Sequence, residues 1–153
     1  MRLSLTTHLP APPERVWEEV QTSRLLEHVA APVVRFRPAS PSELPPIWSD
    51  GSYEVRMLLV GLLPAGKQLI RISRSSDGRA HTLRDDGVGQ LAETWDHRIF
   101  VQPSPDGGTD YTDVLYVHAG ALTPFVWAFA HFFYRHRQRR WRALVSRGFD
   151  YGS

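Results

Sequence analysis

The chain of 153 residues contains no cysteine. This absence excludes disulfides, zinc–thiolate sites, iron–sulfur clusters and cysteine nucleophiles together. It also fits a reducing compartment, and the first residues, Met1-Arg2-Leu3-Ser4-Leu5, lack the apolar stretch of a signal peptide. We therefore expect a cytoplasmic protein.

Lysine is nearly absent, and the C-terminal part of the chain has almost no acidic residues. Of the 18 cationic residues 17 are arginine, with Lys67 as the one lysine, and residues 114–149 contain no Asp or Glu. Six arginines gather in residues 135–147, a cluster of a kind that can bind nucleic acid. No nucleic-acid-binding motif accompanies it, however, and Arg137 and Arg140 fall on the apolar side of a predicted helix. We expect a solvated helix face and no nucleic-acid partner.

Long apolar runs are also scarce. Residues 114–134 form a stretch of 21 residues without Asp, Glu, Lys or Arg, which is long enough to cross a bilayer. Its first part alternates like a strand, and Ala119-Gly120-Ala121 and Pro124 interrupt the rest. The stretch therefore predicts a strand followed by a helix rather than a membrane span.

Apolar residues make up 42% of the chain, enough for a core, and the length suits one domain over residues 1–153. Apolar and polar residues alternate over residues 2–9 and in several segments between residues 52 and 117. Turn sequences separate these segments: residues 61–66, Asp77-Gly78, Asp86-Gly87 and residues 106–108. This spacing is typical of antiparallel hairpins and not of β-α-β units.

Helices are expected at both ends of this series. Pro12-Pro13 predicts a first short helix, Thr22 or Ser23 caps a second, and a brief strand follows over residues 33–37. The apolar period changes from 2 to 3.6 near residue 122, which predicts a long helix from about residue 123 to 147, with Thr123 as its cap. The sequence thus favours an α+β fold, a seven-stranded antiparallel sheet packed on a long C-terminal helix.

Several segments, taken with this order of elements, resemble those of a known superfamily. They are residues 11–17 (Ala-Pro-Pro-Glu-Arg-Val-Trp), 95–97 (Trp-Asp-His), 111–115 (Tyr-Thr-Asp-Val-Leu) and 133–137 (Phe-Tyr-Arg-His-Arg). The chain resembles small bacterial members of the START-like or Bet v 1-like superfamily, the SRPBCC group of polyketide cyclases and lipid-transfer proteins. This resemblance implies a helix-grip fold, in which a curved sheet wraps the long helix, two short helices follow the first strand, and a cavity holds apolar ligands. The superfamily has no shared catalytic residues, so the resemblance implies none here.

The cavity between sheet and helix is expected to be lined by apolar and aromatic side chains from both, with two polar ones among them. The candidate ligand-binding residues are Tyr53, Met57, Ile70, Trp95, His97, Ile99, Leu115, Phe129, Phe133 and Arg137.

Helical phase divides the C-terminal helix into two sides. Phe125, Val126, Phe129, Phe133, Trp141 and Leu144 share an apolar side, and His131, Arg135, Gln138, Arg142 and Ser146 fall opposite. Arg137 lies within the apolar side, where a cation needs partners. We predict a charge-assisted hydrogen bond from Arg137 to Glu93, Asp96 or Asp113, with Asp113 preferred.

His97, Asp113 and Arg137 are the candidate catalytic residues, because a carboxylate, an imidazole and a guanidinium around one cavity can do acid–base work. A buried structural network and polar orientation of a ligand explain the same residues. No metal and no cofactor are expected: His131 and His136 are five residues apart and do not share a helix face as an i,i+4 pair does.

Three functions remain open. The first is binding of a hydrophobic small molecule, such as a lipid, a quinone or a polyketide-like compound. The second is a polyketide cyclase or aromatase that uses His97, Asp113 and Arg137. The third is a protein-interaction module whose cavity is vestigial. Leu62 and Leu63, in an apolar loop, are expected at the cavity mouth or in transient contact with a membrane.

Overall fold

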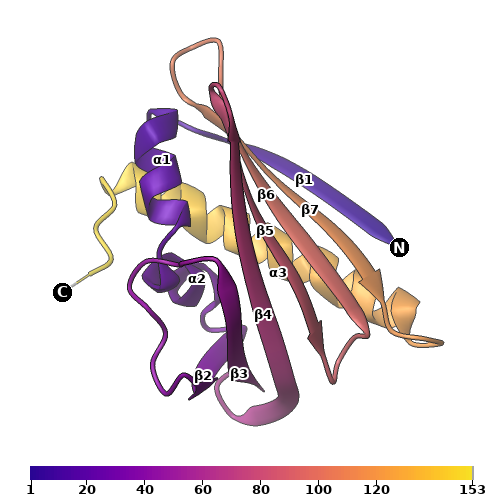
Figure 1. Cartoon of the computed structure of the whole chain (residues 1–153). Helices are drawn as coiled ribbons and strands as arrows, with labels where there is room; N and C mark the ends of the chain where they lie inside the picture. Colours follow the sequence, from indigo (N-terminus) through magenta and orange to yellow (C-terminus); the bar gives the residue numbers. More distant parts are fainter. Residues whose placement is uncertain (153) are drawn as a thin grey trace.

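The computed structural model describes residues 1–152 and has the predicted order of elements (Figure 1). Two short helices follow the first strand, six strands come next, and one long helix ends the fold. The elements are β1 (Arg2–Leu9), α1 (Pro13–Val20), α2 (Ser23–Ala30), β2 (Val34–Ser40), β3 (Gly51–Leu59), β4 (Leu63–Asp77), β5 (Ala80–Gly89), β6 (Thr94–Pro103), β7 (Thr109–His118) and α3 (Thr123–Ser146).

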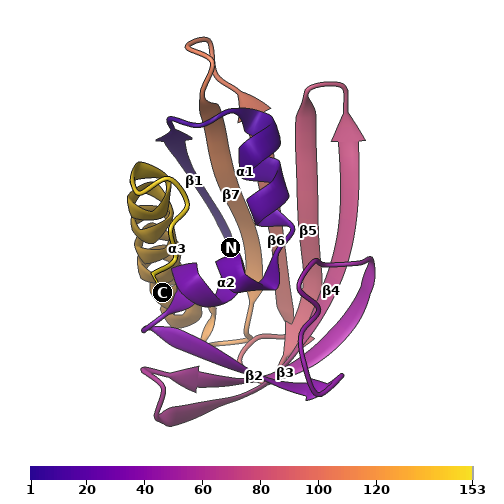
Figure 2. The ribbon, with the colours of Figure 1, turned by 90° about the vertical axis from the view of Figure 1, so that its left-hand side faces the viewer.

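All seven strands form one antiparallel sheet in the order β1-β7-β6-β5-β4-β3-β2. Each strand from β2 to β6 pairs with the next one along the chain, whereas β1 pairs with β7, placing Leu3 opposite Leu115. The sheet is curved, and the three helices lie on its concave side (Figure 2). α3 packs against α2, β1 and β7. The α+β, seven-stranded helix-grip architecture is therefore confirmed.

Local chemistry explains where α1 and α2 begin. Pro13 begins α1, where the missing N–H of proline costs nothing. The Thr22 hydroxyl accepts a hydrogen bond from the N–H of Leu25 at 3.3 Å and caps α2. The prediction that Thr123 caps α3 is wrong: the cap residue is Leu122, and Thr123 donates instead to the carbonyl of Gly120 at 2.7 Å.

The turn expected at Asp86-Gly87 is also wrong, because β5 runs through both residues. A Cβ atom on Gly87 would lie 2.2 Å from the carbonyl oxygen of Leu69 on the neighbouring strand. The glycine is needed there for close approach of two backbones, and not for a turn.

The buried side of helix α3 is rotated relative to the predicted apolar side. Phe133, Trp141 and Leu144 are buried as expected, but Gln138, assigned to the polar side, is only 5% exposed. Phe125, assigned to the apolar side, is 73% exposed. Thr123 and Val126, in the same first turn as Phe125, are both buried at 8% exposure, so the burial of α3 follows helical phase, with the buried side centred nearer to Arg137 and Trp141 than predicted. In residues 1–152, no helix has the length and apolarity needed to cross a membrane.

The C-terminal tail ties the short helices to the end of α3. Buried Glu19 of α1 accepts hydrogen bonds from Arg15 at 2.9 Å, from Arg24 at 2.7 Å and from the hydroxyl of Tyr151. The guanidinium carbons of Arg15 and Arg24 also lie 4.0 Å and 4.4 Å from the ring centroids of Phe149 and Tyr151. Burial alone would raise the pKa of Glu19, but these donors hold it below its ordinary value.

Candidate functional site

A cavity lies between the sheet, α2 and α3. The empty space between its walls is about 980 Å³, including the part at its mouth that is open to solvent. The centre of a water molecule can reach about 90 Å³ of it, several times the ~10–15 Å³ that one buried water needs. The core is therefore not solidly packed at this place.

Most of the cavity wall is apolar. Aromatic side chains come from three directions: Phe36 and Trp95 from the sheet, Trp48 from the loop before β3, and Phe129 and Phe133 from α3. The Phe129 and Phe133 rings stack with centroids 5.8 Å apart. A wall of this composition suits an apolar molecule with a few polar groups.

Eight of the ten predicted cavity residues line this space: Met57, Ile70, Trp95, His97, Ile99, Phe129, Phe133 and Arg137. The other two do not. Tyr53 packs edge-on against Trp48, and its hydroxyl donates to the carbonyl of Ser49 at 2.8 Å. Leu115 is fully buried in the cluster that joins β7 to the start of α3. The alternation of a strand shows which face a residue occupies, but not whether that part of the face meets a cavity or solid core.

The polar end of the cavity contains a buried network around Asp113. His97 Nε2 lies 2.7 Å from Asp113 Oδ1, Gln138 Nε2 donates to Asp113 Oδ2 at 2.9 Å, and the Tyr111 hydroxyl donates to Oδ1 at 3.4 Å. Gln138 Nε2 also donates to the carbonyl of Leu5 at 2.9 Å. His97 and Asp113 lie together as the sequence predicts, but the prediction that Gln138 lies on the polar side of α3 is wrong.

The directions in which the pKa values of His97 and Asp113 are shifted determine which of the two side chains is charged at neutral pH. Burial lowers the pKa of His97 below its ordinary value, although Asp113 acts in the opposite direction. Burial alone would raise the pKa of Asp113, but His97, Arg137 and Gln138 together hold it below its ordinary value. At neutral pH the pair is thus a neutral imidazole that donates from Nε2 to a carboxylate. The Nδ1 lone pair of His97, on the cavity wall, is then the basic atom of this dyad.

The predicted hydrogen bond from Arg137 to a strand acid is wrong for all three acids. Asp113 takes its donors from His97, Gln138 and Tyr111. Asp96, next to His97 in the strand and hence on the other face of the sheet, binds Arg84 at 2.9 Å and Arg98 at 3.3 Å.

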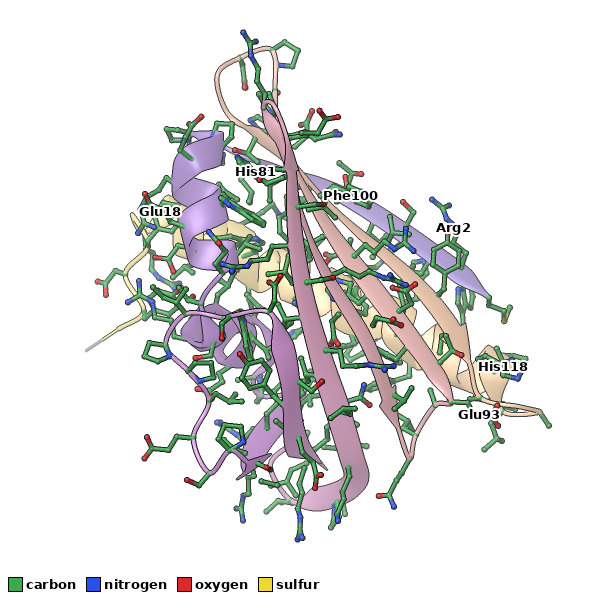
Figure 3. All side chains as sticks on the ribbon, viewed as in Figure 1. Arg2, Glu18, His81, Glu93, Phe100 and His118 are labelled. Atoms are coloured by element: carbon green, nitrogen blue, oxygen red, sulfur yellow. The ribbon has the colours of Figure 1, made fainter. Side chains whose placement is uncertain are left out.

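Glu93, the third acid, is 74% exposed and lies beside His118 at a corner of the molecule, with 3.6 Å between Glu93 Oε2 and His118 Nε2 (Figure 3). Arg137 itself is buried and lines the cavity. Its guanidinium carbon lies 4.9 Å from the ring centroid of Tyr134 and 5.7 Å from that of Phe133. Aromatic rings, and not a carboxylate, are its nearest partners.

Asp85 and Gln68 are polar cavity residues that the sequence analysis missed. Asp85 Oδ1 accepts a hydrogen bond from the backbone N–H of Arg71 at 3.0 Å. Burial raises the pKa of Asp85 to about 7, against the lowering effects of that bond and of the charge of Arg137. One signal was available in the sequence: Asp85 shares its strand face with Leu83, which also lines the cavity.

Other candidate features lie away from the cavity. Within the described chain, residues 1–152, no three His, Asp or Glu side chains converge as metal ligands would. His136 Nε2 lies 2.8 Å from the carbonyl of Ala31, and His131 packs edge-on against Trp127. Leu62 and Leu63, at the tip between β3 and β4, are 80% and 61% exposed.

α1 is fixed to the sheet at the end of the cavity remote from this tip. The ring of Trp17 in α1 stacks on that of His81 in β5, with centroids 4.8 Å apart.

Comparison with known proteins gives a family and a fold. A sequence model of the family described as "Domain of unknown function (DUF8410)" matches residues 7–145. Among curated proteins, none matches the chain. Protein CV1439 from Chromobacterium violaceum has a similar structure, with a TM-score of 0.70 and 18% identity over 94% of this chain and 96% of that one.

Two further structures connect the fold to better-known groups. A START superfamily protein from Mycobacterium smegmatis gives a TM-score of 0.65 and 12% identity over 95% of this chain and 97% of that one. Ara h 8.0201 gives a TM-score of 0.63 and 12% identity over the same shares, 95% and 97%. These likenesses confirm the predicted START-like, Bet v 1-like fold and, at such identities, show the fold alone.

Proposed function

This chain belongs to the family described as a domain of unknown function, DUF8410, and we propose that it binds a hydrophobic small molecule in the cavity between sheet and α3. A lipid, a quinone or a polyketide-like compound fits the proposal. We place this activity in the cytoplasm, which the absence of cysteine supports.

The cavity is the main observation that supports this proposal. Its walls are mostly apolar and aromatic, and they leave room for a small apolar molecule: about 90 Å³ is accessible between them, the same order as the ~150 Å³ apolar cavity that holds benzene. The fold is one whose members generally hold apolar ligands. A protein-interaction module with a vestigial cavity needs a filled core, so the open volume favours binding over that alternative.

Native mass spectrometry of freshly purified protein tests the proposal directly. We expect an adduct that is released by organic extraction and identified as an apolar compound. Met57→Trp should fill part of the cavity and reduce the adduct, because Met57 lines it. Leu58→Trp is the matched control, since the adjacent residue on β3 points to the other face of the strand. An adduct of equal abundance in both variants, or none in the wild type, would contradict binding in this cavity.

A second candidate is an enzyme of the cyclase or aromatase type, favoured by the dyad of His97 and Asp113 at the cavity wall. A neutral imidazole held by a carboxylate is a suitable general base for enolisation. His97→Ala separates the two functions. A binder should retain its adduct in this variant, whereas an enzyme should lose conversion of the extracted compound, followed by mass spectrometry of the incubated mixture.

We further propose that Leu62 and Leu63 touch a membrane transiently during ligand exchange. Both are exposed at a hairpin tip, and Leu59, the last residue of the strand before the tip, lines the cavity. The tip is therefore close to where an apolar ligand would enter.

A further inference from the structure

Arg137 is a buried cation in the cavity wall whose donors are not used by the protein. Its side chain is 7% exposed. A guanidinium has five N–H donors in a planar fork, yet among residues 1–152 we find no hydrogen bond from Arg137, and its Nε is fully enclosed without an acceptor. Buried polar groups without partners are rare and costly, so this position needs a physical reason.

The nearby groups do not supply that reason. The rings of Tyr134 and Phe133 attract the positive charge, but they do not accept N–H hydrogen bonds as oxygen lone pairs do. Asp113 already accepts hydrogen bonds from three side chains. Asp85 lines the same cavity, and its carboxylate is held by the backbone of Arg71. Arg137 lines the cavity, and its terminal Nη groups, unlike Nε, are not fully enclosed, so they are the donors that a molecule in the cavity can reach.

We infer that the ligand of this cavity is an apolar acid, whose carboxylate accepts hydrogen bonds from Arg137 while its body lies against the apolar wall. This inference rests on the proposed binding function and names the ligand class. A carboxylate matches the guanidinium fork with two parallel hydrogen bonds. It also carries a single charge, which suits a site with one unpartnered arginine and a second carboxyl group, Asp85, on the same wall. A doubly charged phosphate would meet stronger repulsion from Asp85.

A pair of probes that differ only in the head group tests the inference. Decanoate and decan-1-ol are titrated into the wild-type protein by isothermal calorimetry at neutral pH. We expect decanoate to bind at least about tenfold more tightly, the factor that one charge-assisted hydrogen bond contributes. Arg137→Met should remove this preference and leave the affinity for decan-1-ol unchanged.

Arg142→Met is the matched control. It removes the same charge from the same helix at an exposed position, where Arg142 donates to the Thr7 hydroxyl at 2.9 Å, and should keep the preference. Equal binding of the two probes by the wild type, or a preference that survives in Arg137→Met, would overturn the inference. If Arg137→Met does not fold, the wild-type comparison alone decides. If neither probe binds, the inference is overturned, and the adduct sought by native mass spectrometry decides separately whether the cavity binds another apolar compound.

Discussion

Replacement of Gln138 by leucine tests whether the Asp113 network stabilises the fold. Gln138 is buried in the middle of α3, and its amide nitrogen donates to both Asp113 Oδ2 and the carbonyl of Leu5 at 2.9 Å. Leucine has a similar volume and fits the apolar surroundings, so the variant removes the two hydrogen bonds without leaving a large cavity. Asp113 keeps its bonds from His97 and Tyr111.

The magnitude follows from these two bonds. A hydrogen bond to a buried charged group contributes about 1.5–3 kcal/mol, and one to a buried carbonyl about 0.5–1.5 kcal/mol. The Asp113 bond dominates, because removing its donor leaves a carboxylate oxygen buried and unpaired. Gln138→Leu should therefore lower the free energy of unfolding by about 2–4 kcal/mol. In a chain of this length, about 3 kcal/mol lowers the melting temperature by roughly 6–12 °C.

Urea unfolding at pH 7, followed by circular dichroism, measures this difference. Arg139→Met serves as the control, because Arg139 is exposed on α3, and it should change the free energy of unfolding by less than about 0.5 kcal/mol. If Gln138→Leu and Arg139→Met unfold at the same urea concentration, the contact of Gln138 with Asp113 does not exist in solution. The rotation of α3 relative to the sheet would then be wrong.

Three further predictions concern other parts of the molecule. Because burial raises the pKa of Asp85 to about 7, its carboxyl ionises more easily in the unfolded chain, and the folded state loses stability as pH rises from about 4 to about 7. The Asp85→Asn variant should therefore have a higher melting temperature than the wild type at about pH 8.5 and the same melting temperature at about pH 4. If the two proteins have the same melting temperature at both pH values, the Asp85 carboxyl is solvated. Tyr151→Phe removes one donor from buried Glu19 and should lower stability by about 1 kcal/mol in urea unfolding, and an unchanged midpoint would mean that the tail is detached. The double variant Leu62→Asp, Leu63→Asp should bind vesicles of phosphatidylcholine and phosphatidylglycerol less than the wild type in a flotation assay, without a change in melting; equal flotation would refute membrane contact.

The fold could be predicted because its determinants are local. Alternation in residues 2–9 and 94–103, prolines at the starts of α1 and α3, and the turn at Asp77-Gly78 each specify an element without reference to distant residues. The error at Gly87 has a different origin. The same dipeptide, Asp-Gly, makes a turn at residue 78, where φ is +61°, and permits close strand contact at residue 87. The neighbouring strand decides between the two.

The candidate site could be predicted only in part. Strand alternation placed His97 and Asp113 on the cavity side, and the distance between them agrees with that placement. The partners of Arg137 and Gln138 could not be predicted from the sequence. Helical periodicity gives the direction of each side chain around the axis of α3, but it does not show how far the sheet curves around the helix and which strands therefore face that side chain. Asp85 shares its strand face with Leu83, but alternation gives only the face of a strand and does not show that this part of the face lines a cavity.

The pairing of β1 with β7 has a consequence for how the chain folds. The N-terminal amino group donates to the carbonyl of Val117, 116 positions further on, at 2.8 Å. Contacts of such high sequence separation slow folding, and we expect stopped-flow refolding on the millisecond-to-second scale rather than in microseconds. During synthesis, β1 leaves the ribosome more than a hundred residues before its partner strand. It remains without a partner until residues 109–118 follow, so that closure of the sheet is a late event in the maturation of the nascent chain.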